Sequence, residues 1–297
     1  MADVEVSQLP GRLPGTPTTL PGMPEATTSE EPMGPTAVWI YAVHHSADTG
    51  PIGIGENRTG VRSNRAVTGV SGEEVRVVEA DGLAAVVGSV PLTDFAPDAL
   101  QRNLNDLDWL AGTAQAHNAV IESVAAGRTV VPVRLAVLCH DDDGVRAMLA
   151  ERHDDFTEAL SLVEGRAEWG VKVFAHPEPA EEPGQRPASG ADYLRGRRDA
   201  LHRNETERDE AARAADELFQ ALCPYAVASR HRPLTDSSLA GRETPMLLNA
   251  AYLVDEARAD EFRTALDEFT DHPLLEVEPT GPWLPYSFVG AIGDGNP

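Results

Sequence analysis

Aromatic side chains and lysine are scarce in this chain of 297 residues. Aromatics make up 5% of the sequence, and only Lys172 among the 24 basic residues is a lysine. The formal net charge is −24, and no basic run interrupts the acidic background. Because such a surface repels phosphate groups, the composition argues against binding to nucleic acid or to an anionic membrane.

Long apolar runs and a set of paired cysteines are also lacking. The longest apolar run covers residues 37–43, whereas a membrane-spanning helix needs about 20 residues. We find no basic region followed by an apolar stretch that would mark a secretory signal. Cys139 and Cys223 are too few for a disulfide framework and are expected to be free thiols. These absences predict an acidic cytoplasmic protein without a membrane span.

Composition divides the chain into four parts. Residues 1–36 hold seven prolines, four glycines and no aromatic residue, so they cannot bury enough apolar surface to offset the entropy of ordering. We expect residues 1–36 to form a disordered tail, residues 37–165 an N-terminal α+β domain, residues 166–289 a second domain and residues 290–297 a flexible tip. The predicted fold class is therefore α+β with two domains.

Apolar periodicity predicts the order β-β-β-α-β-α for the first domain. The expected strands are residues 37–43, 75–79, 83–87 and 129–133, and the expected helices are 97–127 and 142–165. Asp81 and Gly82 separate the second and third strands, and this dipeptide favours the tight turn of a hairpin.

The second domain is predicted to have the order β-α-β-β-α-β, which is typical of the split ferredoxin-like arrangement. The expected strands are residues 168–174, 224–229, 246–254 and 274–278, with a further short one at 286–289, and the helices are 191–222 and 257–269. The middle of the first of these helices, residues 203–210, has almost no apolar side chain. It is interpreted either as a solvated surface or as a surface for a partner.

Three clusters could carry chemistry, and each has a structural explanation. The glycine-rich residues 50–55 follow a strand, but no helical pattern follows them, as a phosphate-binding loop would need. Residues 139–143 contain metal-ligating types without the paired spacing of zinc sites, and their Asp residues suit a helix N-terminus. His117 fits a hydrogen-bonded core histidine, because no nucleophile motif accompanies it. We therefore expect no catalytic residue, no metal and no cofactor.

Several motifs resemble the gas vesicle protein F/L family in order and spacing, over about residues 37–289. They are Trp109-Leu110 with Ala116-His117, Val131-Pro-Val-Arg134, Glu168-Trp-Gly-Val-Lys-Val173, Gly190-x-x-Tyr193-Leu194-x-x-Arg197, Leu248 to Val254, and Thr280-Gly-Pro-Trp283 with Pro285-Tyr-Ser-Phe-Val289. Within them, structural roles are expected for Trp109, His117, Arg134, Glu168, Trp169, Lys172, Tyr193 and Arg197.

The resemblance implies an accessory protein of gas vesicle formation that is not an enzyme, has a ferredoxin-like second domain and is associated with gas vesicles in the cytoplasm. Its implied partners are the small hydrophobic shell protein and other accessory proteins, during nucleation or growth of the shell. We expect Trp283, Pro285 and Tyr286 to form a rigid apolar segment, either a lid over the domain or an anchor for a partner. Glu205 and Arg208 are expected to contribute to the same contacts.

Two other functions stay open at this point. Ferredoxin-like domains often host ligands, so the alternative is a small-molecule-binding or regulatory protein. A metal-dependent enzyme built on His44 and His140 is a third interpretation, and a stoichiometric ion in the purified protein would favour it.

Overall fold

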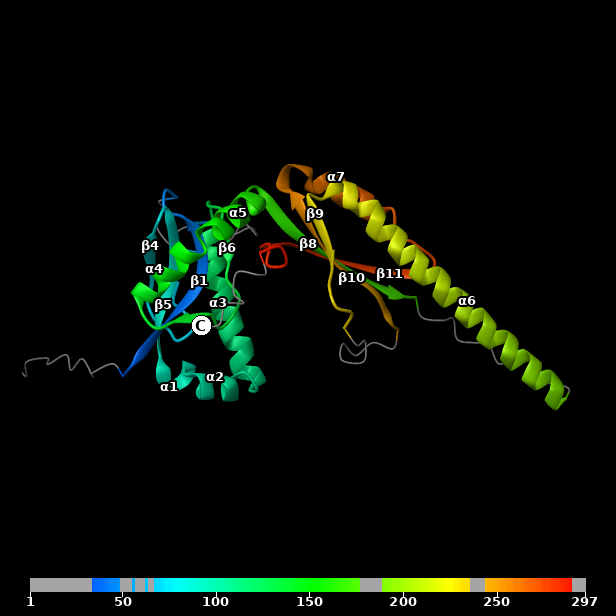
Figure 1. The fold of residues 1–297 in the computed structure, drawn as a ribbon. Coiled ribbons are helices and arrows are strands. Elements are labelled where there is room, and N and C mark those ends of the chain that lie inside the picture. The colour runs from blue at the N-terminus through cyan, green and yellow to red at the C-terminus, as the bar shows by residue number, and fades with distance from the viewer. Residues whose placement is uncertain are drawn as a thin grey trace, which may run out of the picture. The chain divides into compact units, whose positions relative to one another are not determined.

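The computed structural model describes residues 34–48, 55–56, 62–63, 67–176, 189–235 and 244–289. The expected tail, apart from its last three residues, and the expected flexible tip lie outside these ranges, as does most of the glycine-rich stretch at residues 50–55. The described chain is a mixture of helices and two larger antiparallel sheets (Figure 1). A separate two-stranded ribbon pairs β2 (Gly55–Glu56) with β3 (Arg62–Ser63).

The first sheet is built around β1 (Thr36–His45). Its strand order is β4-β5-β1-β6, and β7 also pairs with β1. The other strands are β4 (Val75–Ala80), β5 (Leu83–Pro91), β6 (Val131–Pro132) and β7 (Leu138–Cys139). β4 and β5 form the predicted hairpin, and Asp81 and Gly82 take positive φ angles of 49° and 81°, as a tight hairpin turn requires.

Helices cover both faces of the first sheet (Figure 1). They are α1 (Leu92–Phe95), α2 (Pro97–Asn103), α3 (Leu107–Ala125), α4 (Asp142–Glu151) and α5 (His153–Val163). Because side chains of a strand alternate between faces, Trp39 and Tyr41 pack with α3 residues, whereas Val38 and Ile40 pack with residues of α4 and α5.

The two long helices predicted for the first half are each divided in the structure. The carboxylate of Asp106 accepts hydrogen bonds from the backbone N–H groups of Asp108 and Trp109 at 3.0 and 3.2 Å, so α3 has its own N-terminus. The second helix is divided at Arg152, between α4 and α5. Asp141 caps α4 by accepting from the Gly144 N–H at 2.8 Å, which agrees with the helix-start interpretation of residues 139–143.

The second sheet has the strand order β11-β8-β10-β9, and every neighbouring pair is antiparallel. Its elements are β8 (Arg166–Ala175), α6 (Gly190–Leu222), β9 (Ala228–His231), β10 (Met246–Asp255), α7 (Ala259–Asp267) and β11 (Leu275–Trp283). With α6 and α7 as the crossovers, this is the strand order of the split β-α-β-β-α-β pattern.

Three details of the second half differ from the prediction. A short 3₁₀ helix, Cys223–Tyr225, stands where the strand at 224–229 was expected to begin, and β9 extends instead to His231. Residues 286–289 form turns rather than a strand. Tyr286 and Val289 pack against residues of the first sheet's two cores, whereas the Phe288 ring lies beneath the guanidinium of Arg230 on β9.

Candidate partner-binding site

The predicted apolar segment, residues 281–289, leaves β11 at an irregular point. The register between β11 and β8 shifts between Thr280 and Trp283, and the peptide bond between Gly281 and Pro282 is cis. Gly281 has a φ of 117°, and a Cβ at this position would lie 2.8 Å from the carbonyl oxygen of Glu168. Only glycine fits this close approach, so the motif's glycine sets the path of the segment.

A buried carboxylate on β8 holds the middle of the segment. Glu168 is 2% exposed, and its Oε2 accepts a hydrogen bond from the backbone N–H of Ser287 at 2.7 Å. Its Oε1 accepts from the Ser287 hydroxyl at 2.8 Å and is ion-paired with Arg232. Arg232 in turn donates from Nε to the Ser287 hydroxyl oxygen at 3.0 Å. These three residues, which we call the Glu168 clamp, bring together parts of the chain far apart in sequence.

Tyr286, the residue before Ser287, makes a second polar contact. The Tyr286 hydroxyl donates to Oδ1 of Asn118 on α3 at 2.9 Å. Burial, and secondarily the nearby charge of Glu122, raises the pKa of Tyr286 well above its ordinary value. Leu284 and Tyr286 both pack against the core that contains Trp39. The segment is therefore held by polar contacts at two adjacent residues, Tyr286 and Ser287, and by the apolar packing of Leu284 and Tyr286.

Ahead of these contacts in the segment, the side chain of Trp283 is exposed. Trp283 is 55% exposed, whereas Pro285 is buried and Tyr286 is half-buried. The structure thus brings the three predicted residues into one segment, but Trp283 is the one that offers a large apolar surface. Glu205 and Arg208 are exposed on α6 and make no described contact with this segment.

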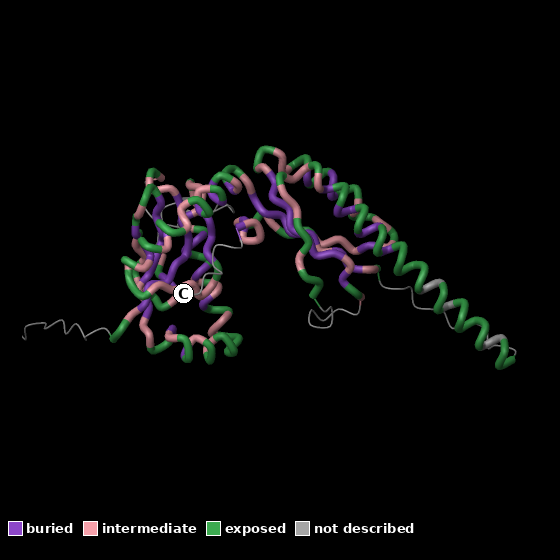
Figure 2. The backbone as a smooth tube through the Cα atoms, viewed as in Figure 1, coloured by how far each residue is buried: buried purple, intermediate pink, exposed green. Residues whose placement is uncertain are grey.

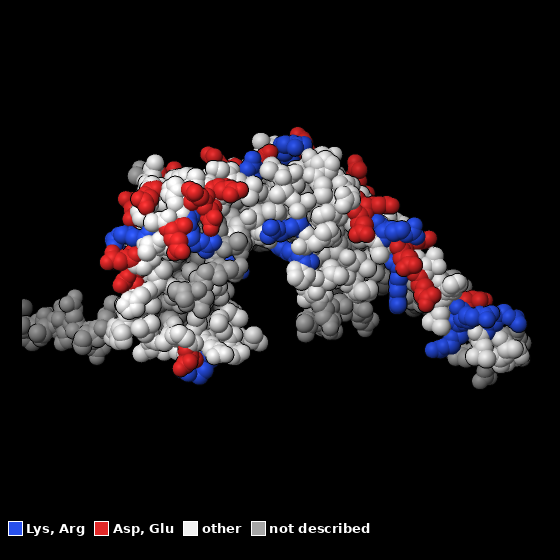
Figure 3. Space-filling view, in the orientation of Figure 1, with Lys and Arg blue, Asp and Glu red and all other residues white. Residues whose placement is uncertain are grey.

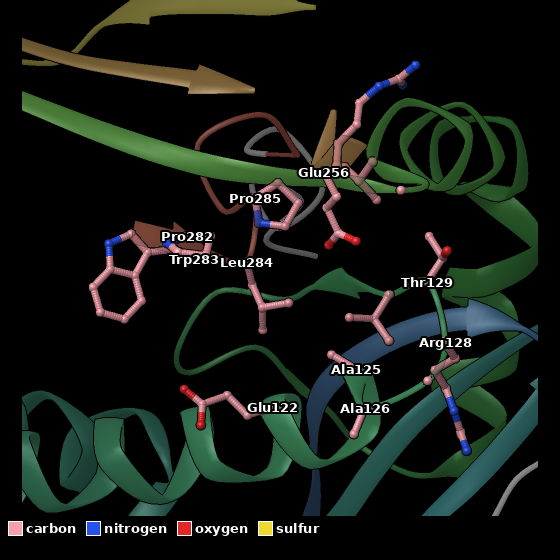
Figure 4. Close-up of a pocket in the computed structure, with 15 residues that line it drawn as sticks. Glu122, Ala125, Ala126, Arg128, Thr129, Glu256, Pro282, Trp283, Leu284 and Pro285 are labelled. Carbon is pink, nitrogen blue, oxygen red and sulfur yellow. The ribbon is translucent and has the colours of Figure 1, made fainter. Parts of the chain in front are cut away.

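A cavity of about 490 Å³ lies beside the segment (Figure 4). The segment contributes Pro282 to Pro285, and the end of α3, the start of β8 and the turn after β10 supply the other walls. In Figure 4 the Leu284 side chain points toward α3, the Glu256 carboxylate points into the cavity, and the Arg128 guanidinium points away.

The aromatic and histidine residues of the family motifs lie mainly in the cores. Trp39 donates from Nε1 to Nδ1 of His117 at 3.0 Å, and His117 Nε2 lies 2.9 Å from the carbonyl oxygen of Val133. These partners require the neutral ring with its proton on Nε2. Burial lowers the pKa of His117, which opposes protonation. Trp109 packs against Phe95 with ring centroids 5.7 Å apart.

The other motif residues have different surroundings. The Trp169 ring lies 5.7 Å from that of Phe262, and Arg263 lies over it. Arg134 is exposed, and Lys172 is half-buried on β8. Arg197 is exposed on α6; Tyr193 belongs to the same helix, but its side chain lies outside the described residues.

Sequence reasoning missed Arg232 and Asn118 as partners of the segment, and Ser287 as a residue through which the segment is held. Their contacts join residues 55 to 168 positions apart, and no local pattern marks such pairs. Within the described ranges, no three His, Cys, Asp or Glu side chains gather as a group that could hold a metal ion. No helix among the described residues is both long enough and apolar enough to cross a membrane.

Comparison with known proteins supplies the family. The family described as "Gas vesicle synthesis protein GvpL/GvpF" matches residues 37–290. The chain is similar to gas vesicle protein L of Streptomyces sp. (strain CB03234), with 43% identity over 75% of this chain and 85% of that protein. It is also similar to gas vesicle protein F of the same strain, with 30% identity over 73% of this chain and 88% of that protein.

Solved structures agree at the level of the fold. The crystal structure of GvpF from Anabaena sp. PCC7120 matches with a TM-score of 0.56 and 18% identity, covering 86% of this chain and 96% of that one. GvpF from Microcystis aeruginosa matches with a TM-score of 0.53 and 15% identity, covering 85% and 98%. On the family match and the identity to the Streptomyces proteins, this chain belongs to the GvpL/GvpF family.

Proposed function

We propose that this protein is an accessory protein of gas vesicle formation that binds the small hydrophobic shell protein and carries out no catalysis. The names of its family and of its relatives support a role in gas vesicle formation. Higher identity to the L protein than to the F protein of the same strain favours the L type. In this proposal the protein works in the cytoplasm at gas vesicles, with other accessory proteins as additional partners.

The observation that carries the binding role is the exposed Trp283 on a fixed segment. Tryptophan is enriched at the centres of protein interfaces, because its ring offers a large apolar area. The Glu168 clamp and the Tyr286–Asn118 hydrogen bond hold the chain three and four residues after Trp283, and Trp283 itself is paired with Glu168 between β11 and β8. Little further ordering is then needed on binding, and such preorganisation raises affinity. A small apolar subunit is a partner that matches this chemistry.

Trp283→Ala is expected to weaken binding of the major shell protein by about tenfold or more, because truncation of a central interface residue costs at least about 2 kcal/mol. The measurement is co-purification of the two proteins, followed by titration of the purified pair. Leu107→Ala is the matched control, because Leu107 is a large apolar residue of α3 that is 79% exposed. Unchanged binding by a folded Trp283→Ala protein would remove Trp283 from the proposed contact.

We also propose that residues 37–165 and 166–289 are two domains, the second ferredoxin-like. The core beneath the second sheet is made of residues between Trp169 and Leu275, which supports a separate folding unit. The first sheet's cores draw on residues from Ala37 to Val163, together with Leu284, Tyr286 and Val289 from the C-terminal segment. The chain therefore crosses back to the first domain at its end.

A second candidate function, binding of a small molecule, is favoured by the cavity beside Trp283. Its volume of about 490 Å³ falls within the range of about 300–1,000 Å³ that ligand sites occupy. A ligand at a hundred times its Kd is expected to stabilise the protein by about 2.7 kcal/mol. A thermal-shift panel of metabolites tests this function, and Ala126→Leu, which narrows the cavity, should abolish any shift that arises there.

A further inference from the structure

The N-terminal part of α6 has no described tertiary packing. Every side chain described between Gly190 and Glu210 is exposed, and the first buried residue is Ala211 (Figure 2). At 1.5 Å per residue, this exposed part is roughly 30 Å long. Helices in proteins owe most of their stability to packing of one face, so a helix of this length points to a partner.

The exposed part carries an apolar stripe with coiled-coil spacing. Leu194 and Leu201 are 67% and 57% exposed and lie seven residues apart. The next position in this step is the exposed Arg208, and the step returns to apolar residues at Ala215 and Leu222, which are buried in the core of the second sheet. Apolar residues seven positions apart are typical of the seam between two packed helices.

Charges along this helix are separated into two blocks. Residues 190–203 contain four Arg and two Asp, a net charge of +2, whereas residues 204–217 contain six acids and two Arg, a net charge of −4. Figure 3 shows blue atoms at the outer end of α6 and red atoms next to them. A helix dipole favours acids at the N-terminus, so the helix's own stability does not explain this order.

The two blocks are complementary when two such helices run antiparallel, and a parallel pair would place like charges together. With Leu194 and Leu201 in the seam, Arg198 and Glu205 occupy the same flanking heptad position. In an antiparallel pair this position of one helix faces the same position of the other, so Arg198 of each copy lies opposite Glu205 of its partner. Such a contact is closed by a two-fold axis.

We propose that two copies of this chain associate through the exposed parts of their α6 helices, packed antiparallel, with Leu194 and Leu201 in the seam and Arg198 facing Glu205. Glu205 has one described neighbour, the exposed His202 at 3.5 Å, and exposed pairs of this kind contribute little. The contact is small, so the dimer is expected to be weak and to loosen as salt is raised. This surface is distinct from Trp283, and its test needs no other protein.

Charge reversal tests the pairing in the full chain by analytical ultracentrifugation over a range of concentrations. Arg198→Glu and Glu205→Arg are each expected to weaken self-association by about tenfold, because each turns two attractive contacts of the dimer into repulsive ones. The double variant R198E/E205R restores the attraction and is expected to return the dissociation constant to within about threefold of the parent value. Glu217→Arg, the same charge change on the opposite side of α6, should leave association unchanged.

Three results would overturn the proposal. The parent protein could stay monomeric at all concentrations. This result would overturn the proposal even if α6 variants impaired binding to another gas vesicle protein. The double variant could fail to recover, which would exclude the antiparallel pairing. Glu217→Arg could weaken association as much as Glu205→Arg, which would mean that net charge alone matters. Because all three positions are exposed, unchanged thermal unfolding of each variant serves as the folding control.

Discussion

Glu168→Ala is expected to lower the free energy of unfolding by about 3 kcal/mol. Removing one member of a buried ion pair typically costs about 3–5 kcal/mol, and the lower end applies because the Arg232 side chain is 33% exposed and keeps some hydration. The substitution also leaves the backbone N–H of Ser287 without its acceptor. Urea unfolding measures the effect as a lower midpoint at an unchanged slope.

The control for this variant is Glu158→Ala, since Glu158 is exposed on α5 and such surface changes stay within about 0.5 kcal/mol. Arg232→Ala should destabilise as well, because it leaves the Glu168 carboxylate buried without its counter-charge. The double variant should lose much less than the sum of the two single losses. Equal midpoints for Glu168→Ala and the parent protein would contradict the structural role of the clamp.

Acidification below about pH 6.5 is the second change with a large expected effect. Burial lowers the pKa values of His117 and His44 in the folded state, whereas the unfolded chain keeps a histidine pKa of about 6.5. Below that pH the unfolded state binds more protons than the folded state. Stability is therefore fully present above about pH 6.5 and falls as pH decreases, by up to about 1.4 kcal/mol per pH unit for each histidine.

A variant measures the share of this pH dependence that comes from His117. His117→Gln removes one of the two titrating rings and is expected to lower the slope of the stability profile between about pH 5 and 6.5, leaving the contribution of His44, at a cost of about 1–3 kcal/mol at neutral pH from impaired hydrogen bonding to Trp39 and Val133. His140→Gln is the control, because the His140 side chain is 93% exposed. Urea unfolding at several pH values gives the profiles, and a parent-like slope in His117→Gln would contradict a contribution from His117.

Sequence predicted the fold best where the local residue pattern and the tertiary packing favour the same element. The run at residues 37–43 lies within β1, buried on both faces, and the Asp81-Gly82 turn closes the hairpin as expected. The order of strands and helices in the second half was also readable, because long periodic runs alternate with breaks. The family followed from the motifs, and the comparisons confirmed it.

The predicted helix bounds were wrong where apolar residues at helical spacing continued across the end of one helix and the start of the next. Leu104 and Leu107 fit the stripe of one long helix, yet they are 38% and 79% exposed, and Asp106 between them starts α3. At the site, the distinctive segment around Trp283 marked it as a candidate anchor, which stays a prediction. The Glu168 clamp was not predicted, since Arg232 and Ser287 reach Glu168 only through the tertiary fold.

The return of the C-terminal segment to the first sheet has a consequence for how the chain is made. Leu284, Tyr286 and Val289 pack against cores whose strands and helices are otherwise complete by Val163. On the ribosome, the first sheet is translated long before these residues, and domains begin to fold as they emerge. Its apolar surface at that place stays uncovered until residues 284–289 have emerged as well, so this packing step comes after the second sheet has been translated.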